Sequence, residues 1–216
     1  MAARNISQIY DLMDFIIRKE RGAFVTIPQG VSALASAQLT VFERYFKLFA
    51  ETQQIHDALR PFRVYYNFTS DGTGNVTFPA DYTHMLASVF TVSGSTRYRV
   101  TFISEDEWVD AMNSQLRPAT TSAPIAKNTA TGFVLFPFQT QSGYFDYLRL
   151  PATPVYAYTQ TGRTITYNAG GSTQIEFTDV YVNEIIGEAL TYWGIYLDDD
   201  KITSYGEQLT QENNNG

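Results

Sequence analysis

Residues 60–78 read RPFRVYYNFTSDGTGNVTF, and this stretch decides the fold class because the hydrophobic pattern changes within it. Pro61 ends the helical pattern that precedes it, since a residue before proline avoids the helical region. Residues 62–68 alternate as in a half-buried strand, and residues 71–75 form a turn cluster that leads to a second short strand. The stretch therefore predicts a change from α to β structure at residue 61.

The residues before this change predict two helices. Apolar residues between Ile6 and Ile17 recur at spacings of three and four, and Gly22 supplies a stop. A second helix, capped by Ser32 or Ser36 and reaching about Leu59, has apolar residues on two adjacent sides. These residues are Leu39, Phe42, Phe46 and Phe49 on one side and Val41, Tyr45 and Leu48 on the other. Because this exceeds a single stripe, we expect the helix to be buried against several neighbours or against another subunit.

The residues after the change predict a β-rich middle and a final helix. Residues 86–103 have the pattern of a hairpin, and a short helix is expected near 104–114. Strands follow at residues 132–138, 143–149, 154–159, 163–167 and 173–177. The last major helix begins at Thr178 or Asp179, and Val182, Ile186 and Trp193 lie on its apolar side.

The predicted fold class is therefore α+β, with a mainly antiparallel β middle. Residues 1–60 and 178–212 are expected to pack together as a helical bundle. Residues 61–177 are expected to form a β-rich lobe, and residues 213–216 a tail.

The composition favours a protein with extensive aromatic packing. Tyrosine and phenylalanine occur 15 times each, and charged residues make up only 17% of the chain, below the usual quarter. The cores of large permanent interfaces exclude charge and favour aromatic residues. An aromatic β core explains the same numbers, so composition alone leaves both possibilities open.

The net charge of −7 is concentrated at one end of the sequence. Residues 176–216 hold nine acidic residues and one lysine, so the preceding 175 residues sum to +1. No basic stripe of the kind that grips DNA is present. The acidic end is either a solvated tail or a docking segment for a basic partner.

Catalytic patterns are weak throughout the sequence. The two histidines, His56 and His84, have no nearby nucleophile motif, and the absence of cysteine excludes thiolate chemistry. Residues 198–200 are three aspartates, but the glycine and distal glutamate of a calcium loop are missing. Paired carboxylates for glycoside hydrolysis remain possible, because their separation is spatial. We expect no enzyme activity, no catalytic residue, no cofactor and no metal.

Membrane insertion and secretion are also not expected. No run of 18 apolar residues occurs, and Asp11 and Asp14 interrupt the N-terminal apolar stretch. We therefore expect a soluble protein made in the cytoplasm.

An ordered series of short motifs occupies the middle of the chain. The motifs are VTFPADY at 76–82, SEDEW at 104–108, PIA at 124–126, FVLFP at 133–137 and YLRLPATP at 147–154. In order and spacing this series resembles the head-to-tail adaptor proteins of short-tailed phages, most of all those of Bacteroidetes phages, including the crAss-like group. Phe78 stands where that family has leucine. The resemblance covers roughly residues 5–200.

The resemblance implies an α+β subunit of a dodecameric ring beneath the portal. The terminal helices would contact the portal protein, the β lobe would meet other tail or ring proteins, and genomic DNA would pass through the lumen without specific binding. The protein would be made in the host cytoplasm and reside at the head–tail junction of the virion. The acidic segment 176–216 is the expected portal-docking end.

Such a ring requires cyclic association, in which one face of a subunit meets a different face of the next. Arg149 is expected either to anchor a carboxylate across that seam or to form a salt bridge within the chain. The full set of candidate interface residues is Phe42, Tyr45, Phe46, Phe49, Tyr147, Arg149, Val182, Ile186, Trp193, Asp198, Asp199 and Asp200.

Other classes of protein remain open. Another ring or tail component, of the stopper or tail-tube type, would also assemble by association of identical subunits and would differ only in its neighbours. A carbohydrate-binding β module is suggested by Tyr144, Tyr147, Tyr156 and Tyr158, although sugar binding does not need a long aromatic helix. A hydrolase would need converging acids or histidines.

Overall fold

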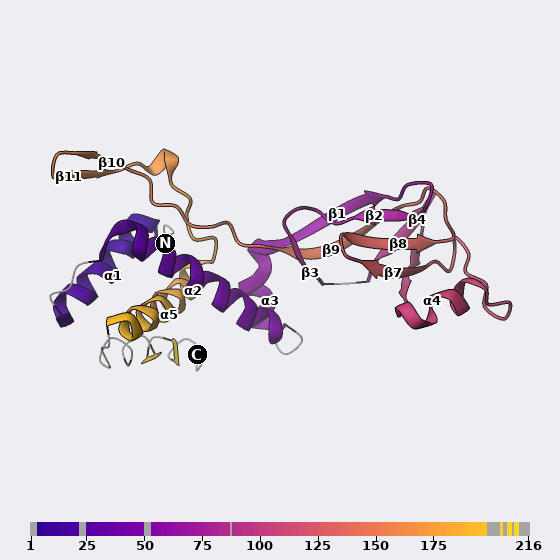
Figure 1. Cartoon of the computed structure of the whole chain (residues 1–216), viewed down its shortest axis with the longest axis horizontal. Helices are drawn as coiled ribbons and strands as arrows, with labels where there is room; N and C mark the ends of the chain where they lie inside the picture. The colour runs from indigo at the N-terminus through magenta and orange to yellow at the C-terminus, as the bar shows by residue number, and fades with distance from the viewer. Residues whose placement is uncertain are drawn as a thin grey trace. The chain divides into compact units, whose positions relative to one another are not determined.

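The computed structural model describes residues 4–21, 25–49, 53–86 and 88–197, together with residues 204, 207, 208, 210 and 211. The fold is α+β, with helices toward both ends and mainly antiparallel sheets between them, so the predicted class is confirmed (Figure 1). The chain divides into two compact units. The first comprises Met1–Pro61 and Pro151–Gly216, and the second comprises Phe62–Leu150.

The first unit is a bundle of helices in contact with one another, as the sequence predicted. Its helices are α1 (Ile6–Arg21), α2 (Ile27–Lys47), α3 (Gln53–Leu59) and α5 (Asp179–Leu197). The side chains that α1, α2 and α5 bury completely are mostly aliphatic and spaced by three or four residues, which is why these segments form amphipathic helices. They include Ile9, Ile17, Leu34, Phe42, Ile185 and Leu190.

The second predicted helix differs in its bounds. It begins at Ile27, earlier than Ser32 or Ser36, and residues up to Leu59 form two helices, α2 and α3. Gln29 Oε1 accepts hydrogen bonds from the Thr26 hydroxyl (2.6 Å) and the Thr26 N–H (3.3 Å), while Pro28 occupies the first turn. Proline is favoured there because the first-turn N–H groups need no partner within the helix.

Residues 151–177 belong to the helical unit, which corrects their assignment to the β lobe. They carry the hairpin of β10 (Tyr158–Thr161) and β11 (Thr164–Tyr167). The Tyr156 ring packs edge-on against Tyr10 of α1 at 5.5 Å, and Gln174 Oε1 accepts a hydrogen bond from the Ile6 N–H at 2.6 Å. The strand expected at 173–177 is a single bridge between Val155 and Thr173. Contacts with α1, which no local pattern reveals, place this segment.

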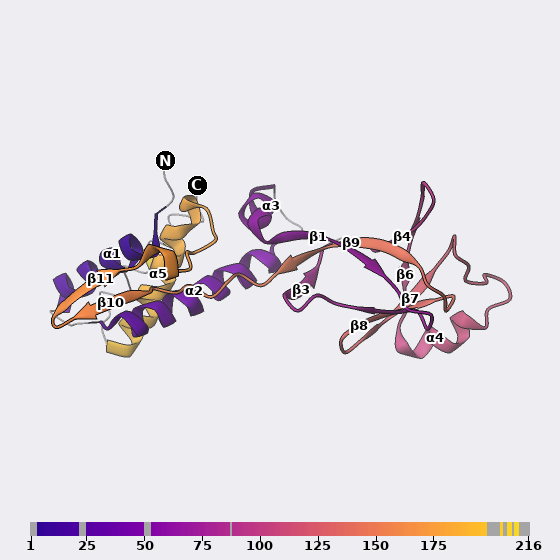
Figure 2. The ribbon, with the colours of Figure 1, turned by 90° about the horizontal axis from the view of Figure 1, so that it is seen from above.

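The second unit consists of two small sheets and one helix (Figure 2). The larger sheet has the order β1-β9-β4-β5, with β3 also on β9, and the smaller has the order β2-β8-β7-β6. Its strands are β1 (Arg63–Thr69), β2 (Asn75–Thr77), β3 (Tyr82–Met85), β4 (Phe90–Ser93), β5 (Thr96–Arg99), β6 (Thr101–Phe102), β7 (Ile125–Thr129), β8 (Gly132–Phe136) and β9 (Ser142–Arg149). All pair antiparallel except β6 with β7.

The core of the second unit is aromatic. Phe68, Phe133 and Phe145 are buried, and each of their rings lies within 6.1 Å of the other two, as measured between centroids. The expected short helix is α4 (Glu105–Met112), whose buried Trp108 packs edge-on against Phe136 of β8. An aromatic β core therefore accounts for part of the unusual composition.

Candidate assembly surfaces

A buried ionic network joins α2 to α5. Glu184 is completely buried, and its Oε1 accepts a hydrogen bond from Arg44 Nη1 at 2.8 Å while its Oε2 accepts one from the Tyr45 hydroxyl at 2.6 Å. Arg44 Nη2 also donates to Glu188 Oε2 at 2.6 Å. Burial, followed by the hydrogen bond to Glu184, raises the pKa of Tyr45. Sequence analysis missed this network. Glu184 and Glu188, four residues apart in an otherwise apolar helix, could have indicated a buried partner for their carboxylates.

Most of the helical interface candidates lie in the chain's own core. Five are at most 8% exposed: Phe42, Tyr45, Val182, Ile186 and Trp193. Helices α1, α3 and α5 all contact α2, so the same chain covers part of each apolar side that the sequence predicted, while Leu39, Phe46, Leu48 and Phe49 stay exposed or partly buried. Phe42, Tyr45, Val182 and Ile186 are therefore core residues, which corrects their assignment to a subunit interface, whereas Trp193 also lines a surface hollow and stays a candidate. Phe46 and Phe49 are only partly buried and stay candidates.

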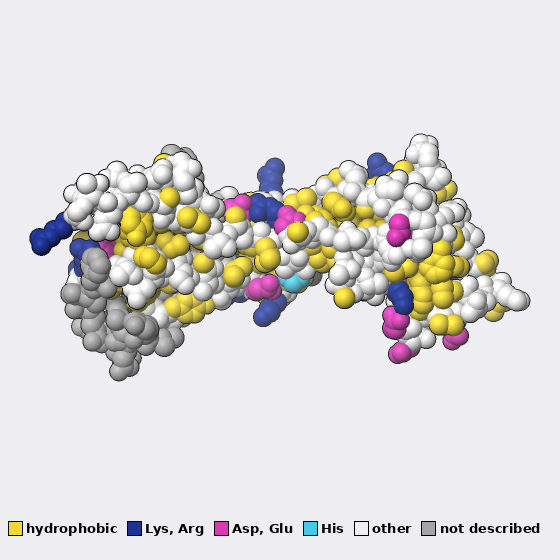
Figure 3. All heavy atoms as spheres, turned by 45° about the horizontal axis from the view of Figure 1, so that its top comes forward, with side chains coloured by type: hydrophobic (Ala, Val, Ile, Leu, Met, Phe, Trp, Pro, Cys, Tyr) yellow, Lys and Arg dark blue, Asp and Glu magenta, His cyan; other side chains and the backbone are white. Residues whose placement is uncertain are grey.

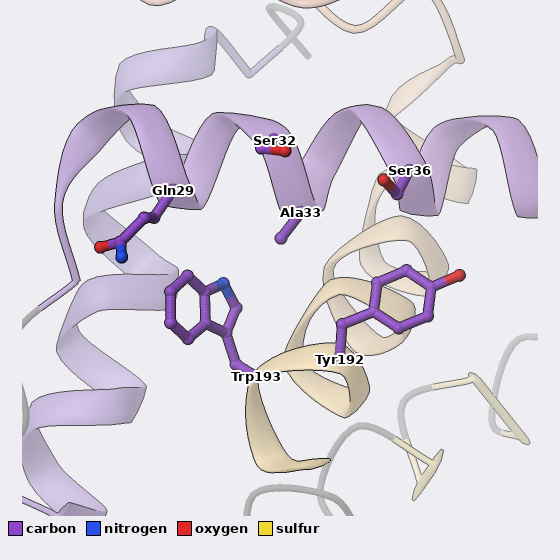
Figure 4. A pocket seen from close by; sticks show the side chains of 6 residues that line it. All are labelled: Gln29, Ser32, Ala33, Ser36, Tyr192 and Trp193. Carbon is purple, nitrogen blue, oxygen red and sulfur yellow. The ribbon is translucent and has the colours of Figure 1, made fainter. Parts of the chain in front are cut away.

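A hollow of about 430 Å³ lies between α2 and α5 (Figure 4). Small or polar side chains of α2 form one wall, and the rings of Tyr192 and Trp193 form the other. The α2 residues are Gln29, Ser32, Ala33 and Ser36. Among the described residues that line this hollow there is no acid or base, so they can accept an apolar side chain but offer no group for proton transfer.

A second hollow of about 510 Å³ lies further along α2. It is lined by Leu39, Thr40, Glu43, Arg44, Lys47 and Leu48, which continue the three- and four-residue spacing of the first hollow. Leu39 is 44% exposed there. One long side of α2 is thus the candidate contact surface that remains on this helix.

A third hollow, of about 380 Å³, lies where α1 meets the β10–β11 hairpin. Its wall includes Tyr10, Asp14 and Tyr158, and Asp14 Oδ2 pairs with Arg18 Nε at 2.7 Å. Burial, followed by the charge of Asp14, raises the pKa of Tyr10 to about 12. The Tyr10 hydroxyl donates to the Val25 carbonyl, so this tyrosine has a structural role in the bundle.

The first and last motifs of the series meet in the second unit. The Tyr147 hydroxyl donates to Asp81 Oδ1 at 2.8 Å, and the Leu150 N–H donates to the Asp81 carbonyl at 3.0 Å. The Phe78 and Tyr82 rings stack at 3.9 Å. Burial, followed by the hydrogen bond to Asp81, raises the pKa of Tyr147 to about 12. Tyr147 is therefore a core residue as well, which corrects its assignment to an interface.

Arg149 makes contacts within its own unit. Its guanidinium lies 5.7 Å from the centre of the Phe62 ring, and its Nη1 donates to the Leu150 carbonyl at 3.2 Å. These contacts hold the end of β9, while the carboxylate partner expected from the sequence stays a prediction. Asp198, Asp199, Asp200 and the 213–216 tail lie outside the described residues, as does most of the segment 201–212.

The outer face of the larger sheet is aromatic and cationic. The Tyr144 ring stacks between Tyr65 and Phe90, with centroid distances of 5.0 and 5.4 Å. Arg97 lies over the Tyr144 ring at 5.5 Å, and Arg63 pairs with Asp146 of the neighbouring strand. Sequence analysis named only Tyr144 from this face, as a possible sugar contact, although the alternation at residues 62–68 predicts that one side of β1 is exposed.

Exposed apolar side chains occur on both units, and Figure 3 shows them as yellow areas on the face that it displays. Single exposed apolar residues are ordinary on any protein. Leu12 and Phe15 are a pair three residues apart on α1, and they are 40% and 63% exposed. They give α1 a second apolar side besides the stripe that it buries, so this side is a further candidate contact surface.

The described residues give little indication of metal binding, membrane insertion or sugar binding. Within them, no group of three or more histidines, cysteines or carboxylates is placed to hold a metal ion, and no helix is long and apolar enough to cross a membrane. The His56 ring packs against Phe49 at 4.1 Å. The tyrosines expected to form a sugar-binding surface are divided, since Tyr144 and Tyr147 belong to one unit and Tyr156 and Tyr158 to the other.

Neither the protein-family models nor the curated proteins contain a match to this chain.

Proposed function

We propose that this chain is a structural virion subunit, the head-to-tail adaptor of a short-tailed phage, and not an enzyme. It would assemble beneath the portal into a ring through which the genome passes. The observation that carries this proposal is the ordered series of motifs from Val76 to Pro154, which resembles that family.

The packing of these motifs supports reading them as one feature. Asp81 from the first motif bonds to Tyr147 and to the backbone of Leu150 from the last, although more than 60 residues separate them. Because the residues of these motifs contact one another, a change in one motif affects the packing of the other. Their occurrence together is therefore stronger support for the family resemblance than either short match alone.

Self-association is supported by the surfaces of the helical unit. The side of α2 with its two hollows and the exposed Leu12 and Phe15 of α1 are apolar surfaces on different helices. A ring needs two different surfaces on each subunit. The low charged fraction of 17% fits a large permanent interface.

The partners follow from the same proposal. They are further copies of this chain, twelve in all as the family resemblance implies, the portal protein, and other tail or ring proteins. Genomic DNA would contact the lumen without specific binding, because each neutralised phosphate adds affinity and would slow passage. Residues 1–175 sum to only +1, which suits such a channel.

The mass of the purified protein, alone and mixed with a portal protein, tests the proposal. A closed ring that binds the portal, or a ring that forms on it, is the expected result. A ring that ignores the portal would favour a stopper or tail-tube component. A stable monomer that binds glycans and ignores the portal would refute assembly and favour a carbohydrate-binding module.

A further inference from the structure

The β5 strand presents an open edge of the larger sheet. In the part of the chain that the structure describes, β5 pairs with β4 alone. The two strands join through a tight turn at Gly94, whose φ of +60° is in the left-handed region that glycine adopts without strain. An open edge is a template on which another extended segment can pair.

The backbone groups of Arg97 and Arg99 face this open side. The Val100 N–H donates to the Val89 carbonyl at 2.9 Å, so residues 89 and 100 are a hydrogen-bonded pair of the antiparallel ladder. Such pairs alternate along a ladder with pairs that share no hydrogen bond. The pairs Phe90–Arg99 and Val92–Arg97 are therefore of the second kind. Their N–H and C=O groups on β5 point away from β4.

The side chains at these two positions give the edge a positive charge. Both are exposed, and they lie on the same face of β5 because they are two residues apart. Among the described residues, neither forms an ion pair with a carboxylate, whereas Arg63 on the same face is paired with Asp146. A cationic edge repels an identical edge, and it attracts a strand that carries carboxylates.

The chain itself contains a segment with matching charge and spacing. Three consecutive acidic residues occur twice in the sequence, at 105–107 and at 198–200. The first run is the opening turn of α4, so it is not available to pair as a strand. The second run follows α5 directly and begins a stretch, 198–216, with five acids and one lysine. In an extended strand, Asp198 and Asp200 would lie on one side with the spacing of Arg97 and Arg99.

We propose that residues 198–200 of one copy add as a strand to the β5 edge of a neighbouring copy. Asp198 and Asp200 then lie opposite Arg97 and Arg99, and the backbone groups of both segments are satisfied together. This contact rests on the proposed self-assembly and supplies it with two different surfaces on each subunit, as ring closure requires. It assigns these aspartates to a second copy of the chain in place of the portal.

Introduced cysteines test the contact directly, because the chain has none of its own. A chain carrying Arg97→Cys is mixed, under mild oxidation, with a chain carrying Asp198→Cys or Asp200→Cys. The expected result is a disulfide-linked dimer, measured by mass, at a yield several times that of a control pair. The control replaces Arg97→Cys with Arg117→Cys, an exposed arginine of the same unit that is not on a strand edge.

Two results of the cysteine experiment overturn the proposal. The first is a dimer yield no higher than that of the control for both aspartate positions. The second is a disulfide-linked monomer when both cysteines are placed in one chain, because the occupant of the edge would then be the chain's own segment.

Exchanging the charges provides an independent test. Arg97→Glu with Arg99→Glu should weaken association of the full chain roughly tenfold, since two attractive cross-strand pairs become repulsive. Adding Asp198→Lys and Asp200→Lys to the same chain should restore it, and a failure to restore it counts against the contact. If rings form equally well with either set of charge changes, this contact is wrong, but the adaptor proposal is unaffected. If the unmodified chain forms no ring, alone or with the portal protein, the adaptor proposal is refuted. The yield of disulfide-linked dimer then still shows whether residues 198–200 pair with β5.

Discussion

The hydrogen bond between Tyr45 and Glu184 gives the most direct test of how the helical unit is held together. Tyr45→Phe removes the hydroxyl that donates to Glu184 Oε2 at 2.6 Å and leaves that oxygen in a fully buried carboxylate without this donor. A buried group that loses its partner costs about 1–3 kcal/mol. We expect the upper half of that range, because the acceptor is charged and none of Glu184 is exposed.

Replacing Glu184, the acceptor of this hydrogen bond, should also lower the free energy of unfolding by an amount that can be estimated. Removing one partner of a buried ion pair costs about 3–5 kcal/mol. Glu184→Ala should lie near 3 kcal/mol, since Arg44 keeps its bond to Glu188 and its side chain is 32% exposed. Tyr45→Phe combined with Glu184→Ala should cost less than the sum of the two single changes by about 1–2 kcal/mol, the signature of a direct interaction.

Urea unfolding followed by tryptophan fluorescence measures these free energies. The chain has two tryptophans, Trp193 in the helical unit and Trp108 in the β unit, so Trp108→Phe leaves a single reporter on the helical unit. Tyr192→Phe is the matched control, because its hydroxyl bonds to Thr40 at a partly buried site and should cost only about 0.5–1 kcal/mol. Additive single changes, or a cost of Tyr45→Phe no larger than that of the control, would refute the reasoning.

Three further outcomes are expected. Gly132→Ala should destabilise the β unit by more than about 2 kcal/mol in urea unfolding, because an added Cβ would lie 1.8 Å from the Val76 carbonyl oxygen. Gly72→Ala, with no atom within 4 Å of the added Cβ, should change little, and equal effects of the two would contradict this account. The raised pKa values of Tyr10 and Tyr147, each about 12 against an ordinary value of 10.0, stabilise the fold below pH 10, and this contribution is lost as the pH rises toward 12. Tyr147→Phe should flatten that loss in a pH series of unfolding free energies, and an unchanged slope would show that Tyr147 does not cause it. Duplex DNA at about 0.1 M salt, where the screening length is about 10 Å, should show little binding in a mobility-shift assay, and tight binding would contradict a channel that lets DNA slide.

Local patterns in the sequence predicted the fold class and several elements. Pro61 and the alternation after it marked the change to β structure, and the turn at Gly94 and the start of α5 lie where the sequence placed them, whereas the hairpin spans Phe90–Arg99 and not 86–103. These features depend on residues near one another in the chain, such as a proline, a turn glycine or a helical repeat. That is the range over which backbone preference and side-chain periodicity act.

The tertiary structure decided which surface each apolar face meets. The periodicity of α2 showed two apolar sides, but only packing showed that helices of the same chain cover Phe42 and Tyr45 and leave Leu39 exposed. In the same way, no local signal pairs β1 with β9 across some 80 residues, or joins residues 151–177 to α1. By itself, then, the sequence determined the α+β class, the change to β structure at Pro61 and the acidic end of the chain. Which apolar faces are already covered, and the open β5 edge with its two arginines, came from the fold, because a hydrophobic repeat specifies that a face is buried and not what buries it.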